Sequence, residues 1–240
     1  MSGGYYVALS GMRARLDQLD RLAEDLANTG TAGFKGERVS NANAPRPVFG
    51  DALETAIDVS VGRRRLDMRQ GTVTPTGRQL DIAIQGDGFL SVQTPNGPRY
   101  TRNGNLLQAA DGSLKTSDGG MVLGEDGPIK LGPGVATIAD DGTVMSGNKA
   151  VGKLQVVRFD EPREMVREGG AILRAGPSQV PQPVEGTVVK SGVFEESNVS
   201  VSERIGELTG VSRSFQALQK AVSVLMNDVD GRAIDSLGRR

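Results

Sequence analysis

Hydrophobic residues recur at alternating spacings of three and four near both ends of the chain. One row comprises Leu9, Met12, Leu16, Leu19, Ala23 and Leu26, and the other comprises Leu208, Val211, Phe215, Leu218, Val222, Leu225 and Val229. This spacing is the a/d pattern of a coiled coil, so each row predicts a helix with one apolar seam. We expect one helix from about Tyr5 to Asn28 and a second from just after Ser197 and Asn198 to about Val229.

The second row contains a phase slip. Ile205, Leu208 and Val211 follow one another at two successive spacings of three, so the row before Leu208 is out of phase with the row beyond it. A slip of this kind overwinds a coiled coil locally or marks the place where a helix changes its packing partner. Periodicity leaves two alternatives open: the seams pack on each other within one chain, or they pack on neighbouring subunits.

The stretch between the two rows is patterned as short strands separated by turns. Asn-Gly, Asp-Gly and Pro-Gly pairs recur every seven or eight residues from Asn96-Gly97 onward. Asn-Gly and Asp-Gly favour the turns with positive φ that join antiparallel strands. We therefore predict an α+β fold, in which long N- and C-terminal helices pair as a coiled-coil-like domain around a central all-β domain, a meander or small barrel.

These patterns divide the 240 residues into four segments. Residues 1–35 contain the N-terminal helix, and residues 36–65 form a connector with little structure of its own. Residues 66–190 form the central β-rich domain, and residues 191–240 contain the C-terminal helix.

Composition lowers the expectation of catalysis. The chain contains neither Cys nor His, so the strongest nucleophile, the commonest general base and the commonest metal ligand are missing. A net charge of −1 gives no overall attraction to nucleic acid or to an anionic membrane. There is no apolar run of about 18 residues that would span a bilayer, and charged residues interrupt the region where a secretory signal would need an apolar block. We expect no enzyme activity, cofactor, metal ion, small-molecule substrate, nucleic acid or direct membrane insertion.

Three groups of residues resemble parts of known sites. Gly86-Asp87-Gly88 lacks the third glycine of a dinucleotide-binding loop and precedes a strand, so a turn is expected. The acidic pairs are expected on the surface, because no cluster of Trp or Tyr would hold a sugar, although a hydrolase using Asp or Glu stays the competing hypothesis. The acidic pairs are Asp140-Asp141, Asp160-Glu161 and Glu195-Glu196. The cluster Arg63-Arg64-Arg65 is expected in a solvated connector or in a charged contact with a neighbouring subunit.

Four motifs, in order along nearly the whole chain, resemble those of the bacterial flagellar rod and hook proteins. The segment Leu26-Ala27-Asn28-Thr29-Gly30-Thr31-Ala32-Gly33-Phe34-Lys35 resembles the N-terminal signature of this family, and Glu196-Ser197-Asn198-Val199-Ser200-Val201 resembles its C-terminal signature. Leu80 to Phe89 and Tyr100 to Asn105 resemble its central motifs. The short segment between Lys35 and the central motifs makes the resemblance closest to the proximal rod subunits, with distal rod and other axial proteins as the alternative. One departure is Glu24-Asp25, where the family often carries Asn.

The resemblance implies a structural subunit of the proximal rod of the flagellar basal body. Such proteins are exported by the flagellar type III apparatus without a cleaved signal, polymerise through their terminal helices into an inner tube across the periplasm, and transmit torque. The implied partners are copies of this chain, other rod proteins and the export apparatus. The expected assembly interface comprises Leu9, Met12, Leu16, Leu19, Leu26, Asn28, Phe34, Asn198, Val199, Leu208, Phe215, Leu218, Val222 and Leu225.

Overall fold

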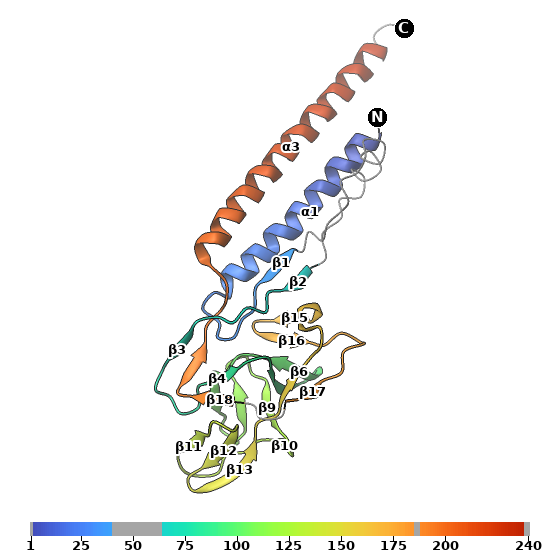
Figure 1. Ribbon diagram of the computed structural model, residues 1–240. Helices are drawn as coiled ribbons and strands as arrows, with labels where there is room; N and C mark the ends of the chain where they lie inside the picture. Colours follow the sequence, from blue (N-terminus) through green and yellow to red (C-terminus); the bar gives the residue numbers. More distant parts are fainter. Residues whose placement is uncertain (1, 40–63, 185–187, 238–240) are drawn as a thin grey trace. The chain divides into compact units, whose positions relative to one another are not determined.

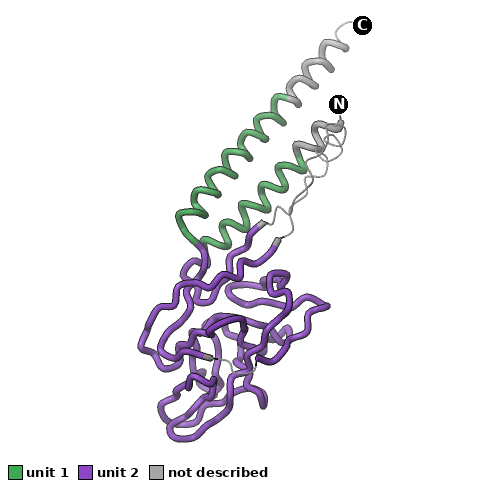
Figure 2. Tube along the Cα trace, in the orientation of Figure 1, with its two compact units in different colours: residues 1–26, 39–63, 200–240 green, residues 27–38, 64–199 purple. Residues whose placement is uncertain are grey.

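A computed structural model of the chain describes residues 2–39, 64–184 and 188–237 (Figure 1). Helix α1 spans Ser2–Ala27, helix α3 spans Val201–Leu237, and the strands lie between them in the sequence. The chain divides into two compact units (Figure 2): a helical unit, which includes residues 2–26 and 200–237, and a β unit of residues 27–38 and 64–199. Most of the expected connector, residues 36–65, lies outside the described residues. Neither of the described helices is long and apolar enough to cross a membrane.

Ser200 is the N-cap of helix α3. Its hydroxyl accepts a hydrogen bond from the Glu203 amide at 3.4 Å, which is the N-cap half of a Ser-x-x-Glu capping box. The cap therefore lies just after Ser197 and Asn198, which belong to the β unit. Helix α3 continues through Gly231 to Leu237, although the sequence predicted that it would end at about Val229. An interior glycine costs a helix only about 1 kcal/mol, so it weakens the helix without stopping it.

Helices α1 and α3 lie side by side and antiparallel in the helical unit (Figure 1). Near one end of the contact, Arg204 Nε lies 3.1 Å from the Asp25 carboxylate. Further along, a Cβ added at Gly11 would lie 3.6 Å from Leu218 Cδ1. The positions of α1 that meet α3 therefore include a glycine and a carboxylate.

The long coiled-coil pairing that we predicted for the terminal helices is wrong for the described residues. Leu9 and Leu16, in the expected seam of α1, are 39% and 45% exposed, whereas Leu22, outside that seam, is buried. A coiled coil needs apolar a and d side chains in an unbroken row on both helices, whereas the positions of α1 that meet α3 include Gly11 and Asp25. Within the described residues, the corrected fold has the two α-helices α1 and α3, in contact with each other, on either side of a β-rich region in the sequence.

The β unit is built from antiparallel strand pairs. Its large sheet has the order β15 (Val166–Gly169), β16 (Ile172–Arg174), β6 (Gly97–Thr101), β5 (Phe89–Thr94), β9 (Met121–Gly124), β8 (Leu114–Thr116) and β7 (Leu106–Gln108). Beside this path, β10 (Gly127–Pro128) pairs with β9, and β14 (Val156–Arg158) pairs with β5 and with β17 (Gln182–Pro183). A short 3₁₀ helix, η1, spans Pro162–Glu164.

The remaining described strands form small sheets. The three-stranded sheet comprises β11 (Ala136–Ile138), β12 (Thr143–Ser146) and β13 (Lys149–Lys153). The two-stranded sheets pair β1 (Glu37–Val39) with β2 (Arg64–Leu66), β4 (Ile82–Gln85) with β18 (Val188–Ser191), and β3 (Val73–Pro75) with β19 (Val193–Glu195). The last two pairs join the segment before α3 to strands that come early in the β unit.

Strand β5 lies between two hydrophobic cores, because alternate side chains of a strand point to opposite faces. Leu90 and Val92 belong to the larger core, and Phe89 belongs to the smaller one. In the smaller core, the ring of Phe159 packs edge-on against Phe89 and Tyr100, at centroid distances of 6.0 and 4.7 Å. Few aromatic residues are present in the chain, and these three are concentrated at one place.

Two hairpins of the β unit are copies of one pattern, displaced by 30 residues. In the β7–β8 hairpin Gln108 pairs with Leu114, and in the β11–β12 hairpin Ile138 pairs with Val144 at the equivalent position. Leu114 and Val144 are both fully buried in the larger core. The two hairpins therefore present the same strand position to the same core.

The turns of these hairpins repeat as well. Asp111 accepts a hydrogen bond from the Ser113 amide at 3.1 Å, and Asp141 accepts one from the Thr143 amide at 2.9 Å. The glycine between them, Gly112 or Gly142, has a φ of 79° or 84°, which other residues rarely adopt. The recurring Asp-Gly pairs of the sequence are thus turns, as predicted.

Candidate functional site

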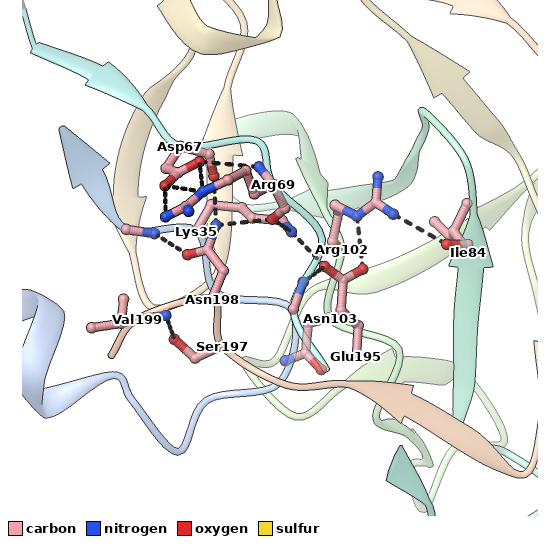
Figure 3. A network of polar contacts seen from close by, with 12 residues as sticks. Lys35, Asp67, Arg69, Ile84, Arg102, Asn103, Glu195, Ser197, Asn198 and Val199 are labelled. Carbon is pink, nitrogen blue, oxygen red and sulfur yellow. Dashed lines mark hydrogen bonds and ion pairs between the residues drawn. The ribbon is translucent and has the colours of Figure 1, made fainter. Parts of the chain in front are cut away.

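Three charged side chains from distant parts of the chain meet inside the β unit (Figure 3). Lys35 follows α1 in the sequence, Arg102 follows β6, and Glu195 is the last residue of β19. One carboxylate oxygen of Glu195 accepts a hydrogen bond from the Lys35 ammonium group, and the other lies 3.0 Å from Arg102 Nε. The side chains of Lys35 and Glu195 are each only 1% exposed. Charges buried to this degree need partners to offset the loss of water.

The remaining hydrogen-bonding groups of Lys35 and Glu195 meet the segment that follows β2. Lys35 Nζ donates to the Arg69 carbonyl at 2.8 Å, and Glu195 Oε1 accepts from the Gly71 amide at 3.0 Å. A Cβ at Gly71 would lie 2.0 Å from the Glu196 carbonyl oxygen, so only glycine fits there. This segment is therefore held against both charged residues.

Arg102 is held by backbone carbonyl groups as well as by Glu195. Its Nη1 donates to the carbonyls of Gly86 and Gly88 at 3.0 and 3.1 Å, and its Nη2 donates to that of Ile84 at 3.1 Å. The turn Gly86-Asp87-Gly88 is thus a turn between strands β4 and β5, as predicted, and its carbonyls bind a guanidinium group.

Glu195 is the anion that two cations share. Burial is the largest influence on its carboxylate and acts to raise its pKa, but Arg102 and Lys35 outweigh burial and hold the pKa below its ordinary value of 4.5. For Lys35, burial again comes first and lowers its pKa below 10.5; Glu195 acts to raise the pKa, and the neighbouring charge of Arg102 acts to lower it further. Both Lys35 and Arg102 thus favour the charged form of Glu195, whereas the charged form of Lys35 is favoured by Glu195 and opposed by Arg102.

Asn198 uses both ends of its side-chain amide in the same network (Figure 3). Its Oδ1 accepts from the Gly36 amide at 2.9 Å, and its Nδ2 donates to the carbonyls of Asp67 and Arg69 at 2.7 and 2.9 Å. Its own amide donates to the Phe34 carbonyl at 3.3 Å. An Asn presents both donors and acceptors in one plane, which is what this position requires.

Phe34 is completely buried beside this network. The guanidinium carbon of Arg167 lies 4.3 Å from the centre of its ring, within the range of a cation–π interaction. The preceding Gly33 has a φ of 66°, and a Cβ there would lie 2.2 Å from the Arg102 carbonyl carbon. The Gly-Phe-Lys part of the N-terminal signature is thus fixed by a close backbone approach, an aromatic contact and an ion pair.

The structure brings some of the expected interface residues together and leaves others apart. Phe34 and Asn198 meet in the β unit, where the Val199 amide donates to the Ser197 hydroxyl at 3.3 Å. Asn28 accepts a hydrogen bond from the Thr31 hydroxyl at 3.1 Å in the turn after α1. The others lie on the helices. Met12, Leu19, Leu26, Leu208, Phe215, Leu218 and Val222 are half-buried, Leu9 and Leu16 are exposed, and Leu225 lies beyond the described side chains of α3.

Sequence reasoning did not identify the ion cluster. Asp140, Asp141, Asp160 and Glu161 are exposed, as predicted, but the prediction that Glu195 lies on the surface was wrong. Strand periodicity is the signal that finds it: Val193 and Glu195 lie two positions apart on β19, so they share a face, and both are buried. Of the Arg63-Arg64-Arg65 cluster, Arg65 pairs with Glu164 at 3.5 Å, and Arg63 lies outside the described residues.

Among the residues that the structure describes, no group of three or more Cys, His, Asp or Glu side chains is arranged to hold a metal ion. The site instead combines cations, an anion and backbone groups that satisfy one another. This arrangement is suited to holding chain segments in place.

Comparison with known proteins agrees with the two signatures that meet at this site. Residues 83–146 match the family described as the flagellar hook protein FlgE/F/G D1 domain. The chain is 35% identical to the flagellar basal-body rod protein FlgF of Escherichia coli, with 97% of each chain covered. It is 32% identical to the FlgF of Caulobacter vibrioides, with 100% of this chain and 99% of the relative covered. It is 30% identical to the rod protein FlgG of Bacillus subtilis, with 91% and 93% covered. Because the similarity to both FlgF proteins exceeds 30% identity over nearly the whole of each chain, this chain belongs to the flagellar basal-body rod protein family.

Proposed function

We propose that this chain is a structural subunit of the proximal rod of the bacterial flagellar basal body. The observation that carries the proposal is the apolar surface of the helical unit. Leu9 and Leu16 are exposed on α1, and Val201, Ile205 and Val224 are exposed on α3. Leu9 and Leu16 share one face of α1 by their spacing, and Val201 and Ile205 share one face of α3, and exposed apolar rows of this kind are typical of a face that another molecule covers. The names of the relatives, which are basal-body rod proteins, support a flagellar neighbour.

In this proposal the helices pack on neighbouring subunits and not on each other as a coiled coil. Residues 1–35 and 191–240 contribute to the inner tube, and residues 66–190 lie outside it. The contacts to copies of the chain and to other rod proteins come from Leu9, Met12, Leu16, Leu19, Leu26, Leu208, Phe215, Leu218, Val222 and Leu225. Asn28, Phe34, Asn198 and Val199 fix the segments that adjoin the helices. Contacts between different patches of like subunits build an open helical array.

The role that follows is mechanical and not enzymatic. The chain leaves the cytoplasm through the flagellar type III export apparatus without a cleaved signal, joins the rod in the periplasm and transmits torque. The close packing of the β unit around its ion cluster supports a rigid part of such a shaft. The absence of His and Cys from the sequence also argues against an enzyme.

The test replaces exposed Leu16 by Asp in cells whose only copy of the protein is the variant. A charge at a subunit contact costs several kcal/mol, so we expect a folded chain that is missing from purified basal bodies, and cells that do not swim. The matched control is Leu107→Asp on β7, because Leu107 is 43% exposed, close to the 45% of Leu16. Normal swimming of a Leu9→Asp, Leu16→Asp double variant contradicts the proposal.

A position in the distal rod is the alternative, supported by the 30% identity to the FlgG of Bacillus subtilis. The two positions differ in their distance from the cytoplasmic end of the rod. Labelling the chain in purified basal bodies and measuring the position of the label along the rod distinguishes them.

A further inference from the structure

We propose that the buried Lys35–Glu195 pair and Asn198 form a clasp, through which two segments of the β unit become ordered only together. The first segment, residues 28–38, follows α1, and the second, residues 193–199, precedes α3. The two are far apart in the sequence and lie side by side in the network (Figure 3). The proposal concerns a single unassembled chain, so it does not rest on the proposed function.

Backbone hydrogen bonds join the two segments directly. The Gly33 amide donates to the Glu195 carbonyl at 2.7 Å, and the Asn198 amide donates to the Phe34 carbonyl at 3.3 Å. The Gly36 amide donates to Asn198 Oδ1 at 2.9 Å. Each segment therefore supplies partners that buried polar groups of the other need, and an unpartnered buried group is costly.

The charges make this dependence unequal. Without the second segment, Lys35 loses Glu195 and is left in the interior beside Arg102, a charge of the same sign. Without the first segment, Glu195 keeps Arg102 at 3.0 Å and the Gly71 amide at 3.0 Å. Loss of Glu195 therefore leaves two buried cations without their anion, whereas loss of Lys35 leaves a paired carboxylate.

The backbone at Arg69 binds both segments. The Arg69 carbonyl accepts from Lys35 Nζ at 2.8 Å and from Asn198 Nδ2 at 2.9 Å. Since one acceptor serves a donor from each segment, both donors are positioned by the same short stretch of backbone. Neither segment can leave without disturbing the contacts of the other, so a change at one terminal segment reaches the other through this network.

The experiment measures amide hydrogen exchange of the full, unassembled chain in Lys35→Met and Glu195→Gln variants. The reporters are the Gly33 amide in the first segment and the Asn198 amide in the second, both hydrogen-bonded across the clasp. Lys35→Met is expected to raise exchange at both reporters by the same factor. Glu195→Gln is expected to raise it further, by at least about 100-fold, because it strips the anion from two buried cations. The Leu114 amide, bonded to the Ile129 carbonyl at 3.0 Å in the core, is expected to stay unchanged.

The matched control is Arg174→Met, which breaks an ion pair of 2.7 Å with Glu168 at the surface. It is expected to leave both reporters unchanged. Exchange that rises at Gly33 alone in Lys35→Met, with Asn198 still protected, overturns the clasp. If Glu195→Gln does not fold, the Lys35→Met, Glu195→Gln double variant replaces it, because it removes one cation together with the anion. Equal exchange in that double variant and in the parent chain also overturns the clasp.

Discussion

Arg204 lies 3.1 Å from Asp25, and this buried ion pair joins α3 to α1 within the helical unit. Asp25 belongs to Glu24-Asp25, the departure from the family resemblance noted in the sequence. The structure gives Asp25 a partner in the same chain. Arg204 also meets Glu207 at 2.7 Å, one turn along α3. The pair therefore belongs to the contact between the two helices.

Replacing Asp25 by Asn is expected to destabilise the helical unit by about 2 kcal/mol, because the buried Arg204 guanidinium loses its buried carboxylate partner and keeps the exposed Glu207. The measurement is urea unfolding followed by far-ultraviolet circular dichroism at 222 nm, which reports helix. Glu207→Gln is the control, since Glu207 is the exposed partner of the same guanidinium and surface pairs contribute about 1 kcal/mol or less. An equal decrease in the free energy of unfolding in the two variants would contradict a larger contribution from the Asp25–Arg204 pair.

Acid is expected to loosen the β unit through Glu195. Because its pKa lies below 4.5 in the folded chain, the carboxylate contributes stability that is full above the ordinary pKa and is lost as the pH falls toward the lower folded pKa. Asp67, whose pKa is also lowered, acts in the same direction. The free energy of unfolding measured between pH 6 and pH 3 should fall steeply in the parent chain and less steeply in Glu195→Gln. Equal slopes in the parent chain and in Glu195→Gln would contradict this role of Glu195.

Raising the pH is expected to increase the stability of the folded chain through Lys35. Its pKa is below 10.5 in the folded chain, so the unfolded chain binds more protons between the two pKa values, and stability rises with pH across that window. The Lys35→Met variant lacks this rise. Thermal unfolding at pH 8 and at pH 10 measures the difference, and a fall in the parent relative to Lys35→Met in that interval would contradict the assignment.

Local patterns in the sequence were enough to predict the turns and the existence of both helices. Positive φ at Gly112 and Gly142 follows from the Asp-Gly pairs, because glycine tolerates this conformation at little cost. Spacing also placed helices where α1 and α3 lie. The N-cap Ser200 lies in a Ser-x-x-Glu pattern of the sequence, but the polar Ser197 and Asn198 precede it and also resemble a cap.

Contacts between distant residues were beyond these local rules. Leu9 and Leu16 do form an apolar row on α1, but periodicity does not say whether that face packs on α3 or on another molecule. Judged by its residue type alone, Glu195 is expected on the surface, and the partners that offset the cost of its burial, Lys35 and Arg102, are distant from it in the sequence. The candidate site is thus a product of tertiary structure, which brings the two signature segments of the sequence together with Arg102.

The repeated hairpins predict that their turns are interchangeable. Replacing residues 109–116 by the sequence of residues 139–146 keeps the Asp-Gly pair, the hydroxyl residue and the buried aliphatic position, so we expect a folded chain with a thermal midpoint within a few degrees of the parent. Gly112→Ala is the destabilising comparison. Its φ of 79° costs a residue with a Cβ about 1–2 kcal/mol, and that Cβ would also lie 2.8 Å from the Leu131 carbonyl oxygen. A greater loss from the exchange than from Gly112→Ala would show that the hairpins are not equivalent.

Two glycines of α3 are expected to be replaceable within the single chain. A Cβ at Gly206 or Gly210 would meet nothing within 4 Å among the described residues, and neither glycine has a positive φ. Alanine is favoured over glycine in a helix by about 1 kcal/mol, so Gly206→Ala and Gly210→Ala should each raise the free energy of unfolding by about that amount. Circular dichroism during urea unfolding measures the gain, and Gly33→Ala is the opposite control, since its φ of 66° and its close approach to Arg102 forbid a Cβ. If the alanine variants are more stable as single chains but fail to support swimming, then glycine is required at these positions by a neighbouring subunit and not by α3 itself.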